Sequence, residues 1–328
     1  MPFPGSKKIW FDGELIDHEE AKIHVLSHVI HYGTGVFEGE RCYETVKGPA
    51  VFRLGDHSRR LLDSAKIYRM TADCNPVKPD GSKMFPEKVF LNYSIEDINK
   101  ATLETIRANS LKNCYVRPLI FRGDEALGVS PFSCRPHLAI AVWEWGAYLG
   151  ADAIERGVDV QFSSWTRIAP NTFPGMAKAC ANYMNSQLIK MEAQINGYAD
   201  GIALDKDGFI SEGSAMNIFV IKYGKIYTPP LNGSELPGIT RDSAIKIARD
   251  MGFEVVEQRI PREMIYVADE AFFTGSAAEV SPIATVDRIP VGRGYRGEIT
   301  KQIQQRFFDI VQGKAEDKFG WLTFVYKD

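Results

Sequence analysis

The sequence predicts an α+β protein of two domains, and three observations support this. Stretches with the alternating residues of a β-strand are interspersed with stretches of helical periodicity. The 328 residues are enough for two hydrophobic cores. Residues 146–150 carry a glycine at each end and lie between two ordered stretches, which is typical of a linker. We therefore expect a smaller N-terminal domain over 1–145 and a larger C-terminal domain over 151–328.

The N-terminal half begins with the signals of two hairpins. Residues 9–16 predict two short strands around an Asp-Gly turn, and residues 39–52 predict a hairpin interrupted at a Lys-Gly-Pro turn. Asp56 is expected to cap a helix that ends near Met70, because an apolar stripe follows it. The elements expected next are an exposed loop, a helix and two buried strands, over 71–88, 94–111, 115–121 and 137–145.

The C-terminal half alternates strands and helices. Two hairpins are expected to turn at 205–208 and 223–224. Gly252 is a suitable residue to end a helix that begins at Thr240. The other elements expected are strands at 159–163 and 271–274 and helices at 182–196 and 300–312.

Composition argues against several classes of partner. The net charge is −3 and no basic run is present, so we expect neither nucleic acid nor anionic membranes as partners. No stretch approaches the ~20 apolar residues of a membrane span, and the first residues lack the apolar core of a signal peptide. The five cysteines are scattered without a C-x-x-C pair, which fits reduced thiols and a cytoplasmic location.

Three short segments have features of a phosphate site. Arg60 lies in the first turns of a predicted helix, where the helix dipole disfavours a cation and a bound anion would relieve the conflict. Residues 237–240 place Pro and Gly before a helix, which leaves backbone N–H groups for an anion. Residues 274–277 end a strand with small hydroxyl side chains. Each has an ordinary alternative, namely a solvated arginine, a capping turn and a plain turn.

Lys178 and Glu212 are the candidates for covalent chemistry. Lys178 lies among small residues that leave room at its tip, and small residues also follow Glu212. A lysine that forms a Schiff base and a carboxylate for a ring nitrogen are the minimum that pyridoxal phosphate chemistry requires of a protein. The alternatives are a surface lysine and a carboxylate that faces water. Lys66 also has small neighbours, but helical spacing takes it off the apolar stripe, so we interpret it as solvated.

Three histidines suggest a different class of function. On a helix, His24, His28 and His31 would share one face, a pattern that can bind a metal. The acidic residue of a zinc-hydrolase motif is missing between them, and β-branched neighbours favour an extended segment. We therefore expect no metal, and a metal-binding hydrolase is kept as an alternative.

Longer motifs carry a family resemblance. They include H-Y-G-T-G-V-F-E-G at 31–39 and L-P-G-I-T-R at 236–241. The other matching segments are 41–43, 51–53, 63–68, 115–120, 145–150, 169–172, 210–213 and 317–321. Together they resemble the branched-chain-amino-acid aminotransferases of pyridoxal-phosphate fold type IV, over nearly the whole chain. The resemblance implies a small N-terminal α/β domain and a larger C-terminal domain with a mixed sheet or barrel.

The resemblance also implies roles toward the cofactor, pyridoxal 5′-phosphate. Lys178 would form the Schiff base and shuttle the proton, and Glu212 would keep the ring nitrogen protonated. Tyr183 would hydrogen-bond the cofactor's O3′. The residues implied at the phosphate are Arg60, Ile239, Thr240 and Ser276.

Substrate contacts are implied in the same way. Arg117 would meet the distal carboxylate of glutamate. Tyr32 and Val129 would reach in from the other subunit, so we expect at least a homodimer. The residues implied at the α-carboxylate are Tyr115, Gly275, Ser276 and Ala277. Those implied at the pocket wall are Phe37, Tyr115 and Tyr148.

The expected reaction transfers the amino group of L-leucine, L-isoleucine or L-valine to 2-oxoglutarate, giving a branched 2-oxo acid and L-glutamate. The alternatives in this fold act on D-amino acids, (R)-amines or aminodeoxychorismate, and the motifs at 37–39 and 115–118 argue against them. A non-catalytic binding protein is disfavoured because Lys178 and Glu212 are both present. The chain departs from the family pattern at Glu40, Cys180-Ala181, Met216, Ser276 and the long stretch 71–88.

Overall fold

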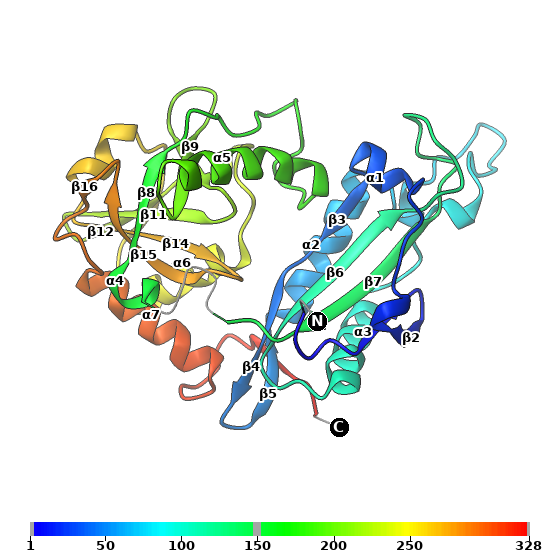
Figure 1. Ribbon diagram of the computed structural model, residues 1–328, viewed down its shortest axis with the longest axis horizontal. Helices are drawn as coiled ribbons and strands as arrows, with labels where there is room; N and C mark the ends of the chain where they lie inside the picture. Colours follow the sequence, from blue (N-terminus) through cyan, green and yellow to red (C-terminus); the bar gives the residue numbers. More distant parts are fainter. Residues whose placement is uncertain (1–2, 147–151, 327–328) are drawn as a thin grey trace. The chain divides into compact units, whose positions relative to one another are not determined.

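The computed structural model describes residues 3–146 and 152–326, and these fall into two compact units (Figure 1). Unit 1 consists of Met1–Trp145, Ala177–Ala181 and Asp317–Asp328, and unit 2 of Gly146–Met176 and Asn182–Glu316. Two short segments from beyond residue 151, one of which contains Lys178, therefore belong to unit 1. Residues 147–150 of the expected linker lie outside the described residues.

Within the described residues, unit 1 is built on an eight-stranded sheet whose neighbouring strands are all antiparallel. The strand order is β17-β5-β4-β6-β7-β1-β2, and β3 pairs with β6. The strands are β1 (Lys8–Phe11), β2 (Glu14–Asp17), β3 (Gly35–Phe37), β4 (Glu40–Thr45), β5 (Gly48–Phe52), β6 (Cys114–Arg122), β7 (Pro136–Trp143) and β17 (Leu322–Phe324). The hairpins expected at 9–16 and 39–52 are confirmed as β1–β2 and β4–β5.

Two longer helices, α2 (Leu54–Ile67) and α3 (Ile95–Asn109), pack on the sheet of unit 1 (Figure 1). Their buried residues, such as Leu61 and Ile106, share one core with Val116 of β6. Each such side chain contributes roughly 1.5–3 kcal/mol when removed from water. The shorter helical turns are α1 (His28–Tyr32), η1 (His18–Glu20), η2 (Ala72–Cys74) and η3 (Glu87–Val89).

Of the two predicted helix starts in unit 1, that of α3 is correct and that of α2 is wrong. The prediction that Asp56 caps α2 is wrong, because the N-cap is Arg53 in the left-handed region at φ 54°. The Asp56 carboxylate instead accepts a hydrogen bond of 2.6 Å from Arg53 Nε. The start of α3 is as expected, since the Ser94 hydroxyl accepts from the Asp97 amide over 3.1 Å.

Within the described residues, unit 2 is built on a nine-stranded mixed sheet of order β10-β9-β8-β15-β14-β11-β12-β13, with β16 paired to β15. Because β10 also pairs with β11, the strands β8, β9, β10, β11, β14 and β15 close into a barrel. The strands are β8 (Val158–Phe162), β9 (Asp200–Leu204), β10 (Ile210–Gly213), β11 (Asn217–Lys222), β12 (Lys225–Thr228), β13 (Val255–Glu257), β14 (Glu270–Gly275), β15 (Glu279–Val286) and β16 (Ile289–Pro290). The expected α+β class and the mixed barrel are confirmed.

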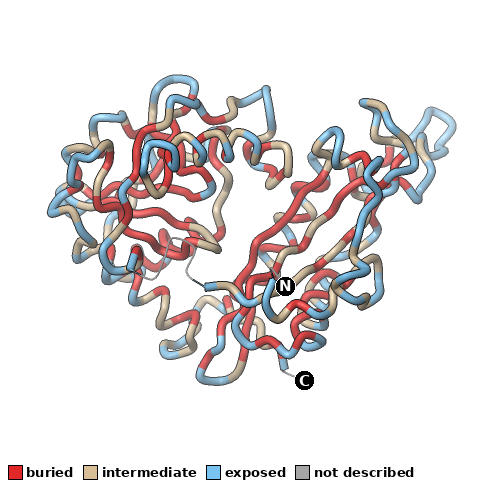
Figure 2. The backbone as a smooth tube through the Cα atoms, in the orientation of Figure 1, coloured by how far each residue is buried: buried red, intermediate tan, exposed pale blue. Residues whose placement is uncertain are grey.

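Helices cover parts of the unit 2 barrel. The helices α6 (Ile239–Asp250) and α7 (Glu298–Val311) contact each other and the strands β14 and β15, and α5 (Tyr183–Ile195) contacts β9. The shorter turns of unit 2 are α4 (Ala153–Arg156) and η5 (Arg262–Val267), and η4 (Cys180–Asn182) lies where the chain passes from unit 1 to unit 2. Buried residues follow the barrel strands (Figure 2). None of the helices in the described part of the chain has the length and apolar character that a membrane span requires.

The sequence pattern did not predict β15, although it is the longest strand of unit 2. All its residues except Thr285 are buried, so the polar–apolar alternation of a half-exposed strand is missing. It also contains Pro282, opposite Phe272 of β14, and proline normally argues against the interior of a strand.

Candidate active site

Two neighbouring elements of unit 1 fix the backbone of Lys178. Ala179 forms an isolated bridge with Val36, and the Lys178 carbonyl accepts a hydrogen bond of 3.0 Å from the Phe37 amide. The Lys178 amide donates to Ser64 Oγ of α2 over 3.0 Å. The lysine Nζ lies 5.1 Å from the centroid of the Phe37 ring. A segment distant in sequence is thus held against β3, with its lysine beside an aromatic side chain.

Phe37, Tyr115 and Arg117 lie together in unit 1. Alternation along β6 predicts Tyr115 and Arg117 on one face, and the Arg117 Cζ lies 5.4 Å from the Tyr115 ring centroid. It also lies 4.7 Å from the Phe37 centroid. The Arg117 Nε is buried and has no hydrogen-bond partner among the described residues. This arrangement is an apolar wall that carries a guanidinium, which suits a ligand that is part apolar and part anionic.

Gly39 makes room for Tyr115. A Cβ added to Gly39 would lie 2.0 Å from the Tyr115 hydroxyl oxygen, a distance that no real side chain tolerates. The glycine in the motif at 31–39 therefore has a steric reason in this structure, because it lets the phenol approach the backbone before β4.

A buried carboxylate, Glu38, holds Arg60. Arg60 Nε donates to Glu38 Oε1 over 2.6 Å, and Nη2 donates to Oε2 over 2.8 Å. His57 Nδ1 lies 2.7 Å from the same Oε2. Burial by itself raises the pKa of the Glu38 carboxyl, but the Arg60 charge, helped by His57, holds that pKa well below its ordinary value. The anion that compensates Arg60 within the protein is therefore Glu38, and phosphate binding by Arg60 stays a prediction.

Glu40 is a second buried carboxyl group near this ion pair. Both of its oxygens are buried and have no hydrogen-bond partner among the described residues. Burial, and then the negative charge of Glu38, hold the pKa of Glu40 well above its ordinary value. Glu40 is therefore protonated under conditions in which Glu38 is ionised. This departure from the family pattern places a second carboxyl group in the core.

In unit 2, three donors bind the buried carboxylate of Glu212. Arg167 Nη2 donates to Oε1 over 2.6 Å. Asn217 Nδ2 and the Leu236 amide each donate to Oε2 over 3.2 Å. Arg167 comes from the irregular segment after β8, and Asn217 is the β11 partner of Glu212 in the barrel. Together these donors stabilise a negative charge on Glu212.

The start of α6 has the features of an anion site. Its N-cap, Gly238, offers no side-chain oxygen to the first amide groups of the helix. A Cβ at Gly238 would lie 1.9 Å from Asn217 Oδ1, so only glycine lets the helix start come this close to β11. Ile239 and Thr240 are the first two helical residues, and both are buried. Backbone N–H groups and a threonine hydroxyl are suitable donors to a phosphate.

Asn217 connects this helix start to the end of β14. Thr274 faces Asn217 in the β11–β14 register, and its buried hydroxyl oxygen has no hydrogen-bond partner among the described residues. The next residues, Gly275, Ser276 and Ala277, are all partly exposed. Unit 2 thus brings the three expected segments, at Glu212, at 239–240 and at 275–277, around one asparagine that the sequence did not single out.

The remaining expected site residues are placed as follows. Tyr183 is the first residue of α5 in unit 2. Tyr32 ends α1 and is 42% exposed, and Val129 lies between β6 and β7 and is 87% exposed, so both can be reached by another molecule. Tyr148 lies outside the described residues.

The three histidines do not share a helix face. The helix α1 begins at His28, so His24 lies before it. The His28 ring nitrogens contact Thr34 Oγ1 at 2.7 Å and the Gly128 carbonyl at 2.8 Å. His31 Nε2 lies 3.0 Å from the Val25 carbonyl. The parts of the chain that the structure describes contain no group of three His, Cys, Asp or Glu residues that could hold a metal ion.

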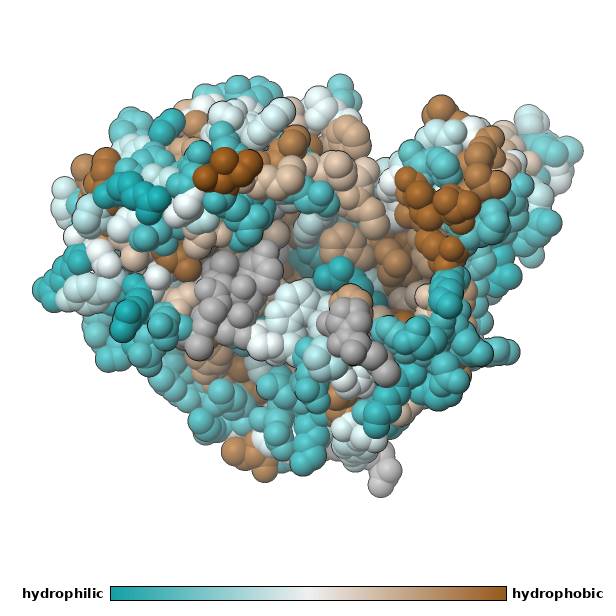
Figure 3. All heavy atoms as spheres, viewed as in Figure 1, coloured by the Kyte–Doolittle hydropathy of each residue, from teal (hydrophilic) through white to brown (hydrophobic). Residues whose placement is uncertain are grey.

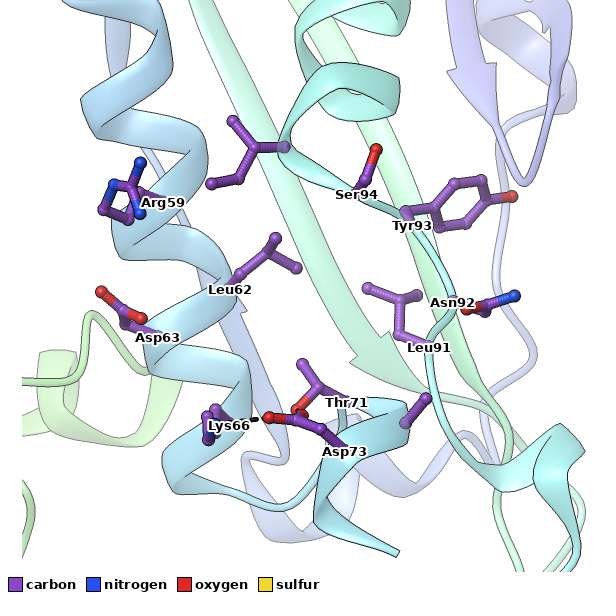
Figure 4. Close-up of a pocket in the computed structure, with 12 residues that line it drawn as sticks. Arg59, Leu62, Asp63, Lys66, Thr71, Asp73, Leu91, Asn92, Tyr93 and Ser94 are labelled. Atoms are coloured by element: carbon purple, nitrogen blue, oxygen red, sulfur yellow. Dashed lines mark hydrogen bonds and ion pairs between the residues drawn. The ribbon is translucent and has the colours of Figure 1, made fainter.

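Lys66 is exposed, as expected, and it pairs with Asp73 (Figure 4). The pair lies at a cavity of about 390 Å³ between α2 and residues 71–95 of unit 1. None of the expected site residues lines this cavity.

Comparison with known proteins decides the family. The Amino-transferase class IV family matches residues 35–286. The chain belongs to the class IV aminotransferases. It is 50% identical to the branched-chain-amino-acid aminotransferase of Escherichia coli (strain K12) over 318 residues, which is 97% of each protein. The predicted family is confirmed.

Two solved structures extend this result. The crystal structure of the Escherichia coli branched-chain amino acid aminotransferase matches with a TM-score of 0.90 at 50% identity, over 98% of this chain and 99% of that one. The branched-chain amino acid aminotransferase from Thermobaculum terrenum, in its PLP-form, matches with a TM-score of 0.86 at 32% identity, over 100% of both chains. The predicted cofactor of this aminotransferase, pyridoxal 5′-phosphate, is confirmed with the family.

The residues of the aminotransferase fit that cofactor. A pyridine nitrogen needs a carboxylate that stays ionised, and Arg167 and Asn217 bind Glu212 in the way that keeps it so. A phosphate needs converging donors, and α6 begins after a glycine N-cap and carries the Thr240 hydroxyl in its first turn. The unpartnered Thr274 hydroxyl, one residue before Gly275, is a further polar group for a ligand among the described residues.

The sequence analysis of this aminotransferase missed Arg167, Asn217 and His57. Arg167 meets Glu212 across 45 residues and His57 meets Glu38 across 19, so no local pattern connects the partners. Glu38 lies inside the motif at 31–39, but the sequence predicted no role for it. A strand pattern does not show which helix packs on the strand, so it could not indicate that residues of α2 bind Glu38. Asn217 lies only five residues after Glu212, so a predicted tight turn between the two strands could have identified it.

Proposed function

We propose that the protein transfers the amino group of L-leucine, L-isoleucine or L-valine to 2-oxoglutarate. The observation that carries this is the placement of the Arg117 guanidinium at 4.7 Å from the Phe37 ring and 5.4 Å from the Tyr115 ring. A branched side chain can pack on the two rings, and glutamate can reach the guanidinium with its distal carboxylate. The names of relatives that are 50% identical over 97% of the chain support the same substrates.

On this proposal Lys178 is the catalytic residue. Bound pyridoxal 5′-phosphate supplies an electron sink that stabilises negative charge at the substrate Cα. Lys178 would hold the cofactor covalently and then move a proton at the substrate Cα. Glu212 would accept a hydrogen bond from the protonated ring nitrogen, with Arg167 keeping the carboxylate ionised.

The phosphate would be bound by donors of different kinds. Ile239 and Thr240 would donate their backbone amides, and Thr240 and Ser276 their hydroxyls. Arg60 would contribute its charge while Glu38 keeps the guanidinium oriented. Tyr183 would hydrogen-bond the cofactor's O3′.

The substrate would be oriented by its α-carboxylate. The residues proposed for this group are Tyr115, Gly275, Ser276 and Ala277. Tyr148 is proposed as a third aromatic wall beside Phe37 and Tyr115. Dual recognition then depends on a single fixed charge, Arg117, at the apolar wall.

The active form would be at least a homodimer. Tyr32 and Val129, both exposed in one chain, would enter the active site of the partner subunit. Apolar side chains also gather on the surface at α1 and the segment before it (Figure 3), where the exposed apolar residues include Ile23, Val25, Leu26 and Ile30. A patch of this kind supports contact with another protein molecule. We also propose a cytoplasmic location, on the ground of the scattered cysteines.

One experiment tests both the reaction and the lysine. Purified holoprotein is assayed with 2-oxoglutarate against L-leucine, L-isoleucine, L-valine, D-leucine and an (R)-amine. It is also reduced with borohydride and digested, and the pyridoxyl peptide is sequenced. We expect turnover with the three branched L-amino acids and the label on Lys178. Preference for D-leucine or the (R)-amine would contradict the substrate, and a label on Lys66 would contradict the assignment of the lysine.

A further inference from the structure

Residues 71–88 form the largely exposed loop that their composition predicts, and specific contacts order this loop within unit 1. Asn75 is buried, and its Nδ2 donates to the Phe85 carbonyl over 2.8 Å. Its Oδ1 accepts from the Phe85 amide over 3.2 Å. An isolated bridge between Val77 and Lys83 closes the turn between them. One asparagine side chain therefore fixes the backbone of Phe85 from both sides.

The start of this segment is tied to α2 and to the stretch between η3 and α3. Asp73 pairs with Lys66 of α2 (Figure 4), and the Ala72 amide donates to the Leu91 carbonyl over 3.2 Å. Segment 71–88 is thus anchored at its start, and its Phe85 is held by Asn75.

Phe85 also contacts a second loop, residues 123–135, which joins β6 to β7. Its ring stacks on that of Phe132, with centroids 4.1 Å apart and an interplanar angle of 6°. The buried Arg122 lies under the stack, with its Cζ 5.9 Å from the Phe132 centroid.

Arg122 also ties together three backbone segments. Its guanidinium donates to the carbonyls of Val89, Cys134 and Arg69, over 3.2, 2.8 and 2.9 Å. An arginine whose hydrogen bonds all go to backbone carbonyls in the core is a structural anchor. Its partners lie on both sides of the contact between segment 71–88 and loop 123–135.

Val129 lies in the middle of loop 123–135 and is 87% exposed. The carbonyl of the preceding Gly128 accepts a hydrogen bond of 2.8 Å from His28 Nε2. Three residues further on, Phe132 rests on Phe85. The position of Val129 therefore depends on His28 on one side and on segment 71–88 on the other.

We propose that segment 71–88 is a brace that positions Val129, and that Phe85 thereby tunes how the branched substrate side chain fits the site that Val129 enters. This rests on the proposed function, in which Val129 belongs to the active site of the partner subunit. Phe85 is a positioning residue, because it acts through Phe132. A displacement of about 1 Å at an active site is enough to change turnover strongly.

Phe85→Ala, Phe85→Tyr and Met84→Ala test the brace. Met84 neighbours Phe85 and is exposed, so it serves as the matched control. We expect Phe85→Ala to raise KM for L-leucine at least about fivefold, with kcat changed less than about twofold. Phe85→Tyr preserves a stacking ring and should restore KM, and Met84→Ala should match the unmodified protein. An unchanged KM in Phe85→Ala would overturn the brace.

Hydrogen exchange gives a readout that does not depend on activity. In Phe85→Ala the amides of 126–134 should exchange faster, while those of α2 and α3 keep their protection. If Phe85→Ala fails to fold, Phe132→Leu removes the same stack from the other side and is measured in its place. Unchanged exchange at 126–134 in the folded variant would also overturn the brace.

Hybrid dimers separate this proposal from the one on which it rests. On the proposed function, chains with Lys178→Ala should be inactive, so each hybrid should report a single active site. When both Phe85→Ala and Lys178→Ala are in one chain and its partner is unmodified, we expect the raised KM. When Phe85→Ala is in the chain with the intact Lys178, we expect the normal KM. The opposite pattern would show that Val129 does not act in the partner's site. An unmodified protein that does not turn over leucine would instead refute the proposed function.

Discussion

Arg167 and Glu212 form a buried ion pair across 45 residues of sequence, with Arg167 Nη2 at 2.6 Å from Glu212 Oε1. The two side chains are only 7% and 4% exposed. The pair joins the irregular segment after β8 to the barrel strand β10. The negative charge of Glu212, which we propose for the cofactor ring nitrogen, is thus compensated within unit 2.

Replacement of Arg167 should destabilise the apo protein, an effect that can be measured independently of enzymatic activity. Arg167→Met leaves the Glu212 carboxylate buried without its cation, which costs about 3–5 kcal/mol. Urea unfolding of the apo protein should show this loss, and Arg167→Met/Glu212→Gln should recover most of it. Arg293→Met is the control, because Arg293 is exposed and hydrogen-bonds the hydroxyl of the exposed Tyr295 at 3.5 Å. A loss in Arg167→Met no larger than in the control would mean that the ion pair does not support the barrel.

Replacement of Arg60 should have two separable effects. Arg60→Ala leaves Glu38 buried without its bidentate partner, so the apo protein should lose about 3–5 kcal/mol of stability. In Arg60→Ala/Glu38→Gln the stability should largely return, while cofactor affinity, measured by spectroscopic titration, should stay weak. The double variant therefore isolates the role of Arg60 toward the phosphate. Normal cofactor affinity in it would show that Arg60 only compensates Glu38.

Replacement of Arg117 should discriminate between the two substrates. Arg117→Ala removes a charge-assisted hydrogen bond to glutamate, a change of about 1.5–3 kcal/mol or roughly 10- to 150-fold in kcat/KM. Leucine, which would use only the rings of Phe37 and Tyr115, should be affected much less. Half-reactions with glutamate and with leucine measure the difference. Equal losses for both would instead assign Arg117 to the fold or the dimer.

Glu40 should make stability depend on pH. Burial, and then the Glu38 charge, raise its pKa in the folded state, so the folded protein binds this proton more tightly than the unfolded chain does. This stabilising contribution is complete below the ordinary value of 4.5 and is lost as the pH rises toward the folded pKa. Glu40→Gln lacks the titration. Its free energy of unfolding should therefore increasingly exceed that of the unmodified protein from about pH 5 upward.

The control for Glu40 is Glu44→Gln on the same strand. Glu44 is exposed and pairs with Lys112 at 3.3 Å, so its replacement should shift stability little and evenly across pH. A constant difference between Glu40→Gln and the unmodified protein across that range would contradict a proton held by Glu40.

Elements with a strong local pattern were predicted correctly. The hairpin at 9–16 has an Asp-Gly turn, and the helix after Ser94 has a serine cap, and both signals depend only on neighbours in sequence. The strand β15 was missed because it is buried on both faces and contains Pro282. Asp56 was wrongly expected as a cap, because only the fold reveals that Arg53 adopts the left-handed region and binds it.

The sequence by itself determined the family, the cofactor and the class of reaction, because motifs such as those at 31–39, 210–213 and 236–241 require particular residue types at short range. Only the tertiary structure decided which of these side chains meet. Glu212 meets Arg167, Arg60 meets Glu38, and Phe85 meets Phe132. The partners in each pair come from different elements, so strand register and helix packing select them, and a local pattern carries no information about either. For the same reason the sequence predicts that residues 71–88 form an exposed loop, but it does not predict the contacts of Asn75 and Phe85 that order this loop.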